Sequence, residues 1–348
     1  MKFNKIFFVF SIPFLLTACV PSELDNIESF VYSFPGLEDI DPLPELTLTK
    51  PIEVKETSGE INITKESDEL VSDVIAAITD KNLTEENLLL IETFAEVAPQ
   101  ISSKEIIDAV TDEWITGILN GTIIPSDNLK KIAAEFKKNP LFQAYFAQLI
   151  LPTVDGLASG GRLLFPINPG IKFFDNPVLR SLAITGPCKD TLEKIYQENV
   201  EKLENQADAQ LAQSKTFYDD LRNQALAIYN KKLTDKEKII GDNVAELNAF
   251  LIDFNQAVDK LSYPEEVKRG LKIYILSFAI ELRAQIVKWG IAYTISAQVA
   301  RDKRVDLANK EQISVNAGIQ VNLKLAIDEL TKSYNTEVEN CHNQGAGG

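Results

Sequence analysis

The sequence predicts a mainly α-helical protein, in which a small N-terminal helical domain is followed by a long-helix antiparallel bundle. Two patterns support this fold class. Between residues 192 and 228, apolar side chains recur every three or four residues, with the mean spacing of an α-helix, about 3.6 residues. Between residues 240 and 261, the steps alternate strictly between four and three, a heptad pattern that requires a coiled-coil-like partner. The chain has 348 residues, 45% of them hydrophobic, which is enough for two domains, each with its own hydrophobic core.

The chain begins with a short export signal. Lys2 and Lys5 supply a positive n-region, and residues 6–16 supply an apolar stretch that is too short for a membrane-spanning helix. The signal closes with Leu16, Thr17, Ala18 and Cys19. These four residues resemble the lipobox of bacterial lipoproteins, in which signal peptidase cuts before the cysteine and lipid is attached to it. The match is confined to about the first 19 residues.

The lipobox resemblance implies that residues 1–18 are a cleaved signal peptide and that Cys19 carries acyl chains such as palmitate. It places the protein in the bacterial cell envelope, anchored to a membrane by lipid. At least two acyl chains are expected, because a single chain holds only weakly. Val20 stands where lipoproteins retained in the inner membrane carry Asp, so the resemblance favours the outer membrane.

The formal net charge of −16, from 51 acidic and 35 basic residues, bears on the choice of partner. Nucleic acid is disfavoured, because proteins bind it largely through Lys and Arg that neutralise phosphates. Anionic lipid also repels an acidic protein, so the expected membrane contact is the acyl anchor itself. A protein partner is expected, and the sequence does not identify it.

The expected roles of the three cysteines depend on the same resemblance. If Cys19 is lipidated, only Cys188 and Cys341 remain, and an oxidising compartment allows them one pairing. We therefore expect a disulfide that closes the long-helix bundle, spanning residues 188–341. A pair of free thiols is the alternative.

Residues 19–65 are acidic and interrupted by five prolines, which exclude a long helix. We expect the early part to be an acidic tether between the lipid and the folded protein. Residues 45–63 alternate between apolar and polar positions. That pattern fits one or two short strands, and it fits a docked extended arm equally well.

Residues 66–150 form the predicted small helical domain. Four hydroxyl residues stand where N-caps belong, each just before a run of apolar residues at helical spacing. These predicted caps are Ser67, Thr84, Ser102 and Ser126. They indicate four short helices. The Gly/Pro-rich apolar connection that follows, residues 151–187, is expected to pack over the core, with a partner-binding surface as the alternative.

The long-helix bundle is expected to contain several breaks. One helix over 187–232 should end before a capping box at Thr234 and Glu237, which starts a second helix over 235–261. Residues 262–265, which include Pro264, then end the second helix and cap a third. If Cys188 and Cys341 are bonded, straight helices of these lengths require a further reversal close to Gly290.

Residues 291–327 carry two conflicting patterns. Two runs within this segment alternate apolar and polar residues, which is a strand signal, and such strands resemble the stems of β-type pore-formers. Residues 315–338 also contain a helical seam, and residues 301–312 lack a turn signal between the two runs. We favour a helix and keep short β elements as the alternative.

The sequence contains no catalytic, cofactor-binding or metal-binding motif. The single histidine, His342, belongs to the predicted loose tail, residues 342–348, and nothing positions it for chemistry. We therefore expect a non-catalytic cell-envelope scaffold or partner-binding protein. The alternative is a membrane-inserting or pore-forming protein that uses residues 291–327, and a hydrolase with carboxylate-only chemistry is a third hypothesis.

Overall fold

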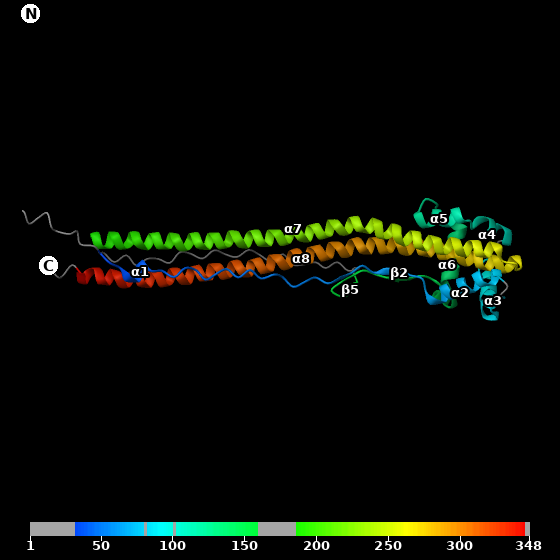
Figure 1. The fold of residues 1–348 in the computed structure, drawn as a ribbon, viewed down its shortest axis with the longest axis horizontal. Helices are drawn as coiled ribbons and strands as arrows, with labels where there is room; N and C mark the ends of the chain where they lie inside the picture. The colour runs from blue at the N-terminus through cyan, green and yellow to red at the C-terminus, as the bar shows by residue number, and fades with distance from the viewer. Residues whose placement is uncertain (1–31, 80–81, 100–101, 159–185, 345–348) are drawn as a thin grey trace, which may run out of the picture. The chain divides into compact units, whose positions relative to one another are not determined.

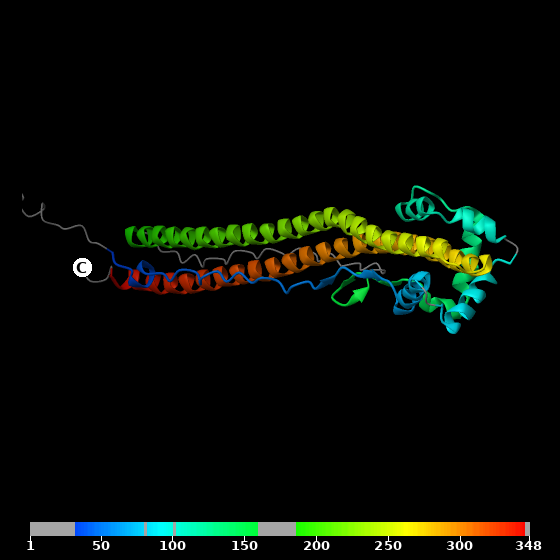
Figure 2. The same cartoon turned by 45° about the vertical axis from the view of Figure 1, so that its right-hand side comes forward.

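The computed structural model describes residues 32–79, 82–99, 102–158 and 186–344. Two long helices dominate it: α7 (Pro187–Lys260, 74 residues) and α8 (Glu265–Gln344, 80 residues). They lie side by side and run antiparallel through the short turn between them (Figures 1 and 2). The mainly α fold and its long antiparallel helices are confirmed.

The chain divides into two compact units. The terminal unit comprises Met1–Leu43, Asn176–Asn205 and Leu323–Gly348, and the main unit comprises Pro44–Asp175 and Gln206–Asn322. Each long helix therefore contributes one part to each unit. The short helices of residues 65–145 belong to the main unit, together with the turn between α7 and α8.

The main unit is built around an aromatic core. Its short helices are α2 (Lys65–Ala76), α3 (Glu85–Ala95), α4 (Ser103–Ala109), α5 (Asp112–Asn120) and α6 (Asp127–Lys138), with 3-10 turns η1 (Ala77–Thr79) and η2 (Pro140–Tyr145). Phe94 lies 4.9 Å from Phe142 and 5.4 Å from Tyr274 of α8, measured between ring centroids. These rings and the seam of α7 around Leu251 are fully buried, so burial of this apolar surface is the main force that holds the unit together.

Three of the four predicted N-caps are confirmed, at Thr84, Ser102 and Ser126. The fourth is wrong: Thr64 caps α2, and its side chain accepts a hydrogen bond from the backbone of Ser67. Ser67 is buried instead, with its hydroxyl on the carbonyl of Tyr145. A fifth helix also appears: Thr111 caps α5 shortly after α4 ends, so two helices follow the predicted cap at Ser102 where one was expected.

Short strands frame the helices of the main unit. β1 (Glu56–Thr57) pairs with β4 (Thr153–Val154), which also pairs with β5 (Leu157–Ala158). β2 (Glu60–Asn62) pairs with β3 (Gln148–Ile150), and all these pairings are antiparallel. The segments just before and just after the short helices are therefore paired with each other. Of the predicted alternating segment 45–63, only β1 and β2, within residues 56–62, are strands.

The rest of that segment is an extended arm docked along the long helices. Gln210 and Tyr218 of α7 donate hydrogen bonds to the carbonyls of Pro44 and Thr49, at 2.8 and 3.0 Å. Further along, Lys232 of α7 forms a 2.6 Å ion pair with Glu56. One residue of the arm thus spans about two residues of α7, as the rises of about 3.3 and 1.5 Å per residue require.

Two predicted breaks in the long helices are wrong. At Thr234 the hydroxyl donates to the carbonyl of Asn230 within α7, so it does not cap a new helix, and α7 continues. At Gly290 α8 also continues, and a Cβ there would lie 3.4 Å from Ile240 Cδ1 of α7. The glycine therefore allows close approach of the two helices and does not reverse the chain.

Residues 291–327 are entirely helical, so the strand interpretation of this segment is wrong and the helical one is right. On an α-helix, residues two apart point in nearly opposite directions. The alternating pattern therefore gives α8 two apolar faces. Tyr293 and Ile319 lie on the buried face, whereas Ile291 and Val321 are 58% and 51% exposed.

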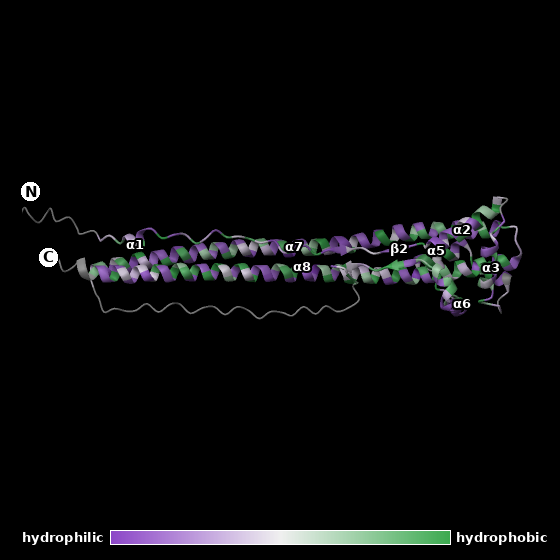
Figure 3. Ribbon diagram, turned by 90° about the horizontal axis from the view of Figure 1, so that it is seen from below, coloured by the Kyte–Doolittle hydropathy of each residue, from purple (hydrophilic) through white to green (hydrophobic). Residues whose placement is uncertain are grey.

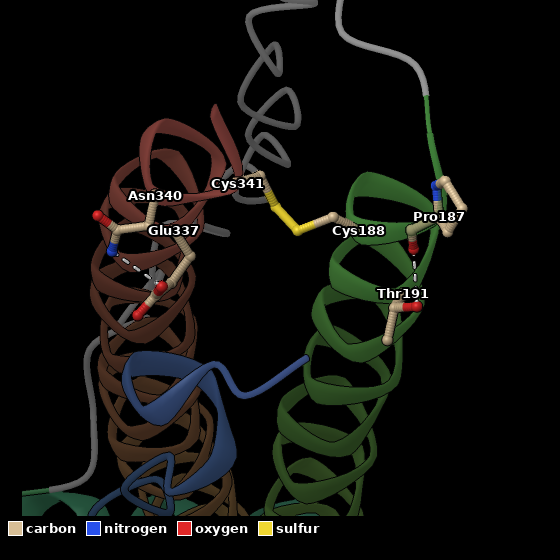
Figure 4. The surroundings of a disulfide bond; sticks show 6 residues. All are labelled: Pro187, Cys188, Thr191, Glu337, Asn340 and Cys341. Atoms are coloured by element: carbon tan, nitrogen blue, oxygen red, sulfur yellow. Dashed lines mark hydrogen bonds between the residues drawn. A yellow bond between two sulfur atoms is a disulfide. The ribbon is translucent and has the colours of Figure 1, made fainter. Parts of the chain in front are cut away.

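The terminal unit is closed by the predicted disulfide, which is confirmed between Cys188 and Cys341, with their Cα atoms 6.1 Å apart (Figure 4). The short helix α1 (Pro35–Glu38) docks on both long helices. Asn199 of α7 donates to the carbonyl of Leu37 at 2.6 Å, and the backbone N–H of Gly36 donates to Glu337 of α8.

Four expectations lie wholly or partly outside the described residues: the signal peptide, residues 1–18, the lipidation of Cys19, most of the apolar connection, residues 159–185, and the end of the predicted loose tail, residues 345–348. The beginning of that tail, residues 342–344, is the last part of α8, so the expectation of a loose tail is wrong there. The described part of the predicted tether, from Tyr32 onward, includes Phe34 and Leu37, both fully buried. That part is docked on the long helices.

Candidate binding surface

A row of cations on α8 receives the C-terminal ends of three short helices. Arg269 donates to the carbonyl of Ala98 just beyond α3, and Lys272 Nζ donates to Val110, the C-cap of α4, at 3.2 Å. Arg283 donates to Leu119 in the last turn of α5, at 3.0 Å. Carbonyl groups at a helix C-terminus lack partners within the helix, so a cation there satisfies them and the helix dipole together.

Arg283 differs from the other two because it is only half-buried. Gly121, the C-cap of α5, adopts a left-handed conformation with φ of 77°, and a Cβ at this position would overlap the Arg283 guanidinium. Glycine therefore serves two purposes here: it ends α5, and it leaves room for the guanidinium to reach Leu119. No carboxylate forms an ion pair with Arg283 within the part of the chain that the structure describes.

The loop after Gly121 is folded back on α5. The backbone N–H of Ile123 donates to Gly117 O at 2.9 Å, and the Ile123 side chain fills the space that a Cβ at Gly117 would need. The next residue, Ile124, is 80% exposed. The loop is therefore fixed by Ile123, and it exposes the aliphatic side chain of Ile124 to solvent.

Three adjoining hollows of about 460, 550 and 560 Å³ share Arg283 as a lining residue. The exposed apolar face of α8 forms one wall, with Val287, Ile291 and Ile295 at 45%, 58% and 39% exposure. Hydrophobic residues recur along α8 in Figure 3. We call this surface the Arg283 groove, and it is defined by Ile123, Ile124, Arg283, Val287, Ile291 and Ile295.

The charged neighbours of the groove are paired with one another. Lys236 lies 3.2 Å from Glu237, and Lys130 lies 3.4 Å from Asp127. Arg283 therefore contributes the groove's unmatched charge among the described residues. An aliphatic wall beside a guanidinium can bind an amphipathic ligand, since the two parts satisfy different portions of it.

The predicted site residues and the groove lie in different units. Cys188 and Cys341 come together in the terminal unit, whereas the groove belongs wholly to the main unit. Among the described residues, acidic, cysteine and histidine side chains form no cluster suited to a metal ion. Within those same ranges, no helix is both long and apolar enough to cross a bilayer.

Sequence reasoning missed the groove, although a signal was present. The alternation of residues 291–299 on a helix implies a second apolar face that α7 cannot cover. No sequence pattern predicts that Arg283 binds the end of α5, because this contact depends on where α5 ends in space. The chain matches no protein-family model, no curated protein and no solved structure.

Proposed function

We propose that this chain is a non-catalytic, lipid-anchored protein of the bacterial cell envelope that acts as a scaffold by binding a protein partner. The observation that carries the proposal is the Arg283 groove. Exposed apolar patches rimmed by polar residues mark interaction sites in soluble proteins. Ile124 and Ile291 are both more than half exposed, although the adjacent core of α8 is tightly buried.

The proposed anchor is lipidated Cys19, and the outer membrane is the proposed location because Val20 follows it. The docking of α1 supports this arrangement for the terminal unit. The 13 residues from Val20 to Tyr32 can span at most about 45 Å. The terminal unit would then lie within that distance of the membrane. A Cys19→Ala variant should leave the membrane fraction, and its retention there would contradict the anchor.

Membrane insertion through residues 291–327 remains the alternative hypothesis. It would require this part of α8 to unfold from helix and re-form as strands, with loss of its contacts to α7. Release of dye from liposomes tests it directly. Nucleic acid is not proposed as a partner, because the chain carries a net charge of −16.

Site-specific photo-crosslinking in the native envelope tests partner binding. A photoreactive residue at Ile291 should form one defined adduct, because this side chain lies in the groove. The matched control is Leu226 on α7, which is similarly aliphatic and 47% exposed, outside the groove. Equal adducts at both positions, or none at Ile291, would contradict the proposal.

A further inference from the structure

We infer that the groove's partner is an amphipathic helix that places one carboxylate among aliphatic side chains, with the carboxylate bound by Arg283. This inference rests on the proposed function, because it specifies the partner of the same surface. Two independent properties of the groove carry it: the spacing of its apolar residues and the state of its single unmatched cation.

The spacing fits a helix. Val287, Ile291 and Ile295 follow one another at intervals of four along α8, so they form one ridge of the kind that packs into the groove of another helix. Ile124, in the loop after α5, lines the same hollow as Val287. A groove lined by aliphatic residues from two elements accepts the apolar face of a helix, whose anchors recur at similar intervals.

The positive charge of Arg283 favours a partner helix that carries a carboxylate. Arg283 donates one hydrogen bond, from Nη1 to Leu119 O, which leaves donors of its planar fork for a ligand. A carboxylate matches such a fork with two parallel hydrogen bonds. A hydrogen bond to Leu119 O holds the guanidinium at this place, and the missing side chain at Gly121 leaves room for it, so the guanidinium is already positioned when a ligand arrives.

Burial strengthens the preference. A partner that covers Val287 and Ile291 would also remove water from the half-buried Arg283. A buried charge without a partner is costly, so a helix with an apolar residue opposite Arg283 should bind poorly. Glu237, which also lines the groove, is paired with Lys236 and does not neutralise Arg283.

A peptide series tests the inference on the full-length protein. The probes are three fluorescein-labelled, N-acetylated and C-amidated 18-residue helical peptides with Leu at intervals of three and four. They differ at one central position, which is Glu, Gln or Lys. By fluorescence anisotropy, the Glu peptide should bind about tenfold or more tightly than the Gln peptide, and the Lys peptide should bind most weakly.

Two variants separate the charge from the fold. Arg283→Gln should abolish the difference between the Glu and Gln peptides. Ile124→Asp is the variant least able to disturb folding, since this side chain is 80% exposed, and it should weaken the Glu peptide about tenfold while strengthening the Lys peptide. Melting curves of both variants test whether they remain folded.

Three results would overturn the inference. One is equal binding of the three peptides, and another is no measurable binding of the Glu peptide. The third is a dimer, seen by sedimentation without peptide, that an Ile291→Asp variant dissociates, because the face would then belong to a second copy. If the adduct at Ile291 persists while the peptides do not discriminate, the proposed function stands and only the carboxylate fails.

Discussion

In the main unit, α7 and α8 share their core with five short helices, whereas in the terminal unit they are joined by one four-residue helix and a disulfide. The main unit buries a cluster of aromatic rings around Tyr274. Among the described residues of the terminal unit, Tyr196 and Tyr334 form the one aromatic pair between the long helices, with ring centroids 4.8 Å apart. Where few apolar residues are available to cover two helices, a covalent link replaces part of the missing core.

Polar contacts are also used differently in the two units. The main unit buries the charge of Lys272 among acceptors from α4 and α7. The terminal unit instead uses Asn199 and Glu337 to bind the backbone of α1. The first arrangement fixes where the short helices sit, and the second fixes where α1 sits.

The largest expected effect is at the centre of the main unit's core. Leu251→Asp would bury a carboxylate at a side chain with 0% exposure, at a cost of several kcal/mol. We expect loss of the cooperative thermal transition, followed by circular dichroism. Leu226→Asp is the matched control on the same helix, and it should change the free energy of unfolding by no more than about 0.5 kcal/mol. A Leu251→Asp protein that melts like wild type would show that this seam is not a core.

A smaller effect is expected from Lys272→Met. Lys272 is 1% exposed, and its ammonium contacts Asn255 and Asp259 at 2.7 and 2.6 Å. Methionine fills a similar volume but leaves buried acceptors unpaired, which should cost about 1–3 kcal/mol. Urea unfolding measures the change. Lys65→Met removes an exposed pair with Glu69 and should shift the midpoint little. Equal shifts would show that the buried cation does not organise the unit.

The smallest effect, and the one that depends on pH, is at Tyr274. Burial raises the pKa of this phenol, whose hydroxyl donates to Ser67 and Tyr145. Tyr274→Phe should lower the free energy of unfolding by about 1 kcal/mol at pH 7. Above about pH 10, the unfolded state of wild type ionises while the folded state stays neutral, so wild type loses stability as pH rises.

The phenylalanine variant lacks that loss, so the stability difference between the two proteins should shrink from pH 9 to pH 11. Thermal melts across this range measure it. A difference that stays constant would contradict the burial of a neutral phenol.

Local patterns predicted the helices but not all of their ends. The heptad seam around Leu251 is buried as expected, because apolar periodicity reports directly on what a helix must cover. The breaks expected at Thr234 and Gly290 do not occur. A capping residue caps only when the chain before it has already left the helix, and Thr234 has a helical residue, Asn230, to which its hydroxyl can donate.

The disulfide was predictable from the cysteine count once Cys19 was set aside, although the route of the chain between its cysteines was not. The expected reversal near Gly290 followed from the wrong helix lengths. With α7 and α8 both uninterrupted, one turn after Lys260 brings Cys188 and Cys341 together. The groove was less predictable, because Arg283 gains its role only from the end of α5.

The central claim is that packing stabilises the main unit, whereas the disulfide stabilises the terminal unit. Hydrogen exchange with and without the disulfide tests this claim most directly. We expect amides in residues 187–205 and 323–344 to exchange at least about tenfold faster in a Cys188→Ser/Cys341→Ser variant, because these helix ends can then separate locally. Amides of residues 265–286, which pack against the aromatic core, should remain the most protected. Equal loss of protection in both regions, or none at the helix ends, would contradict the account.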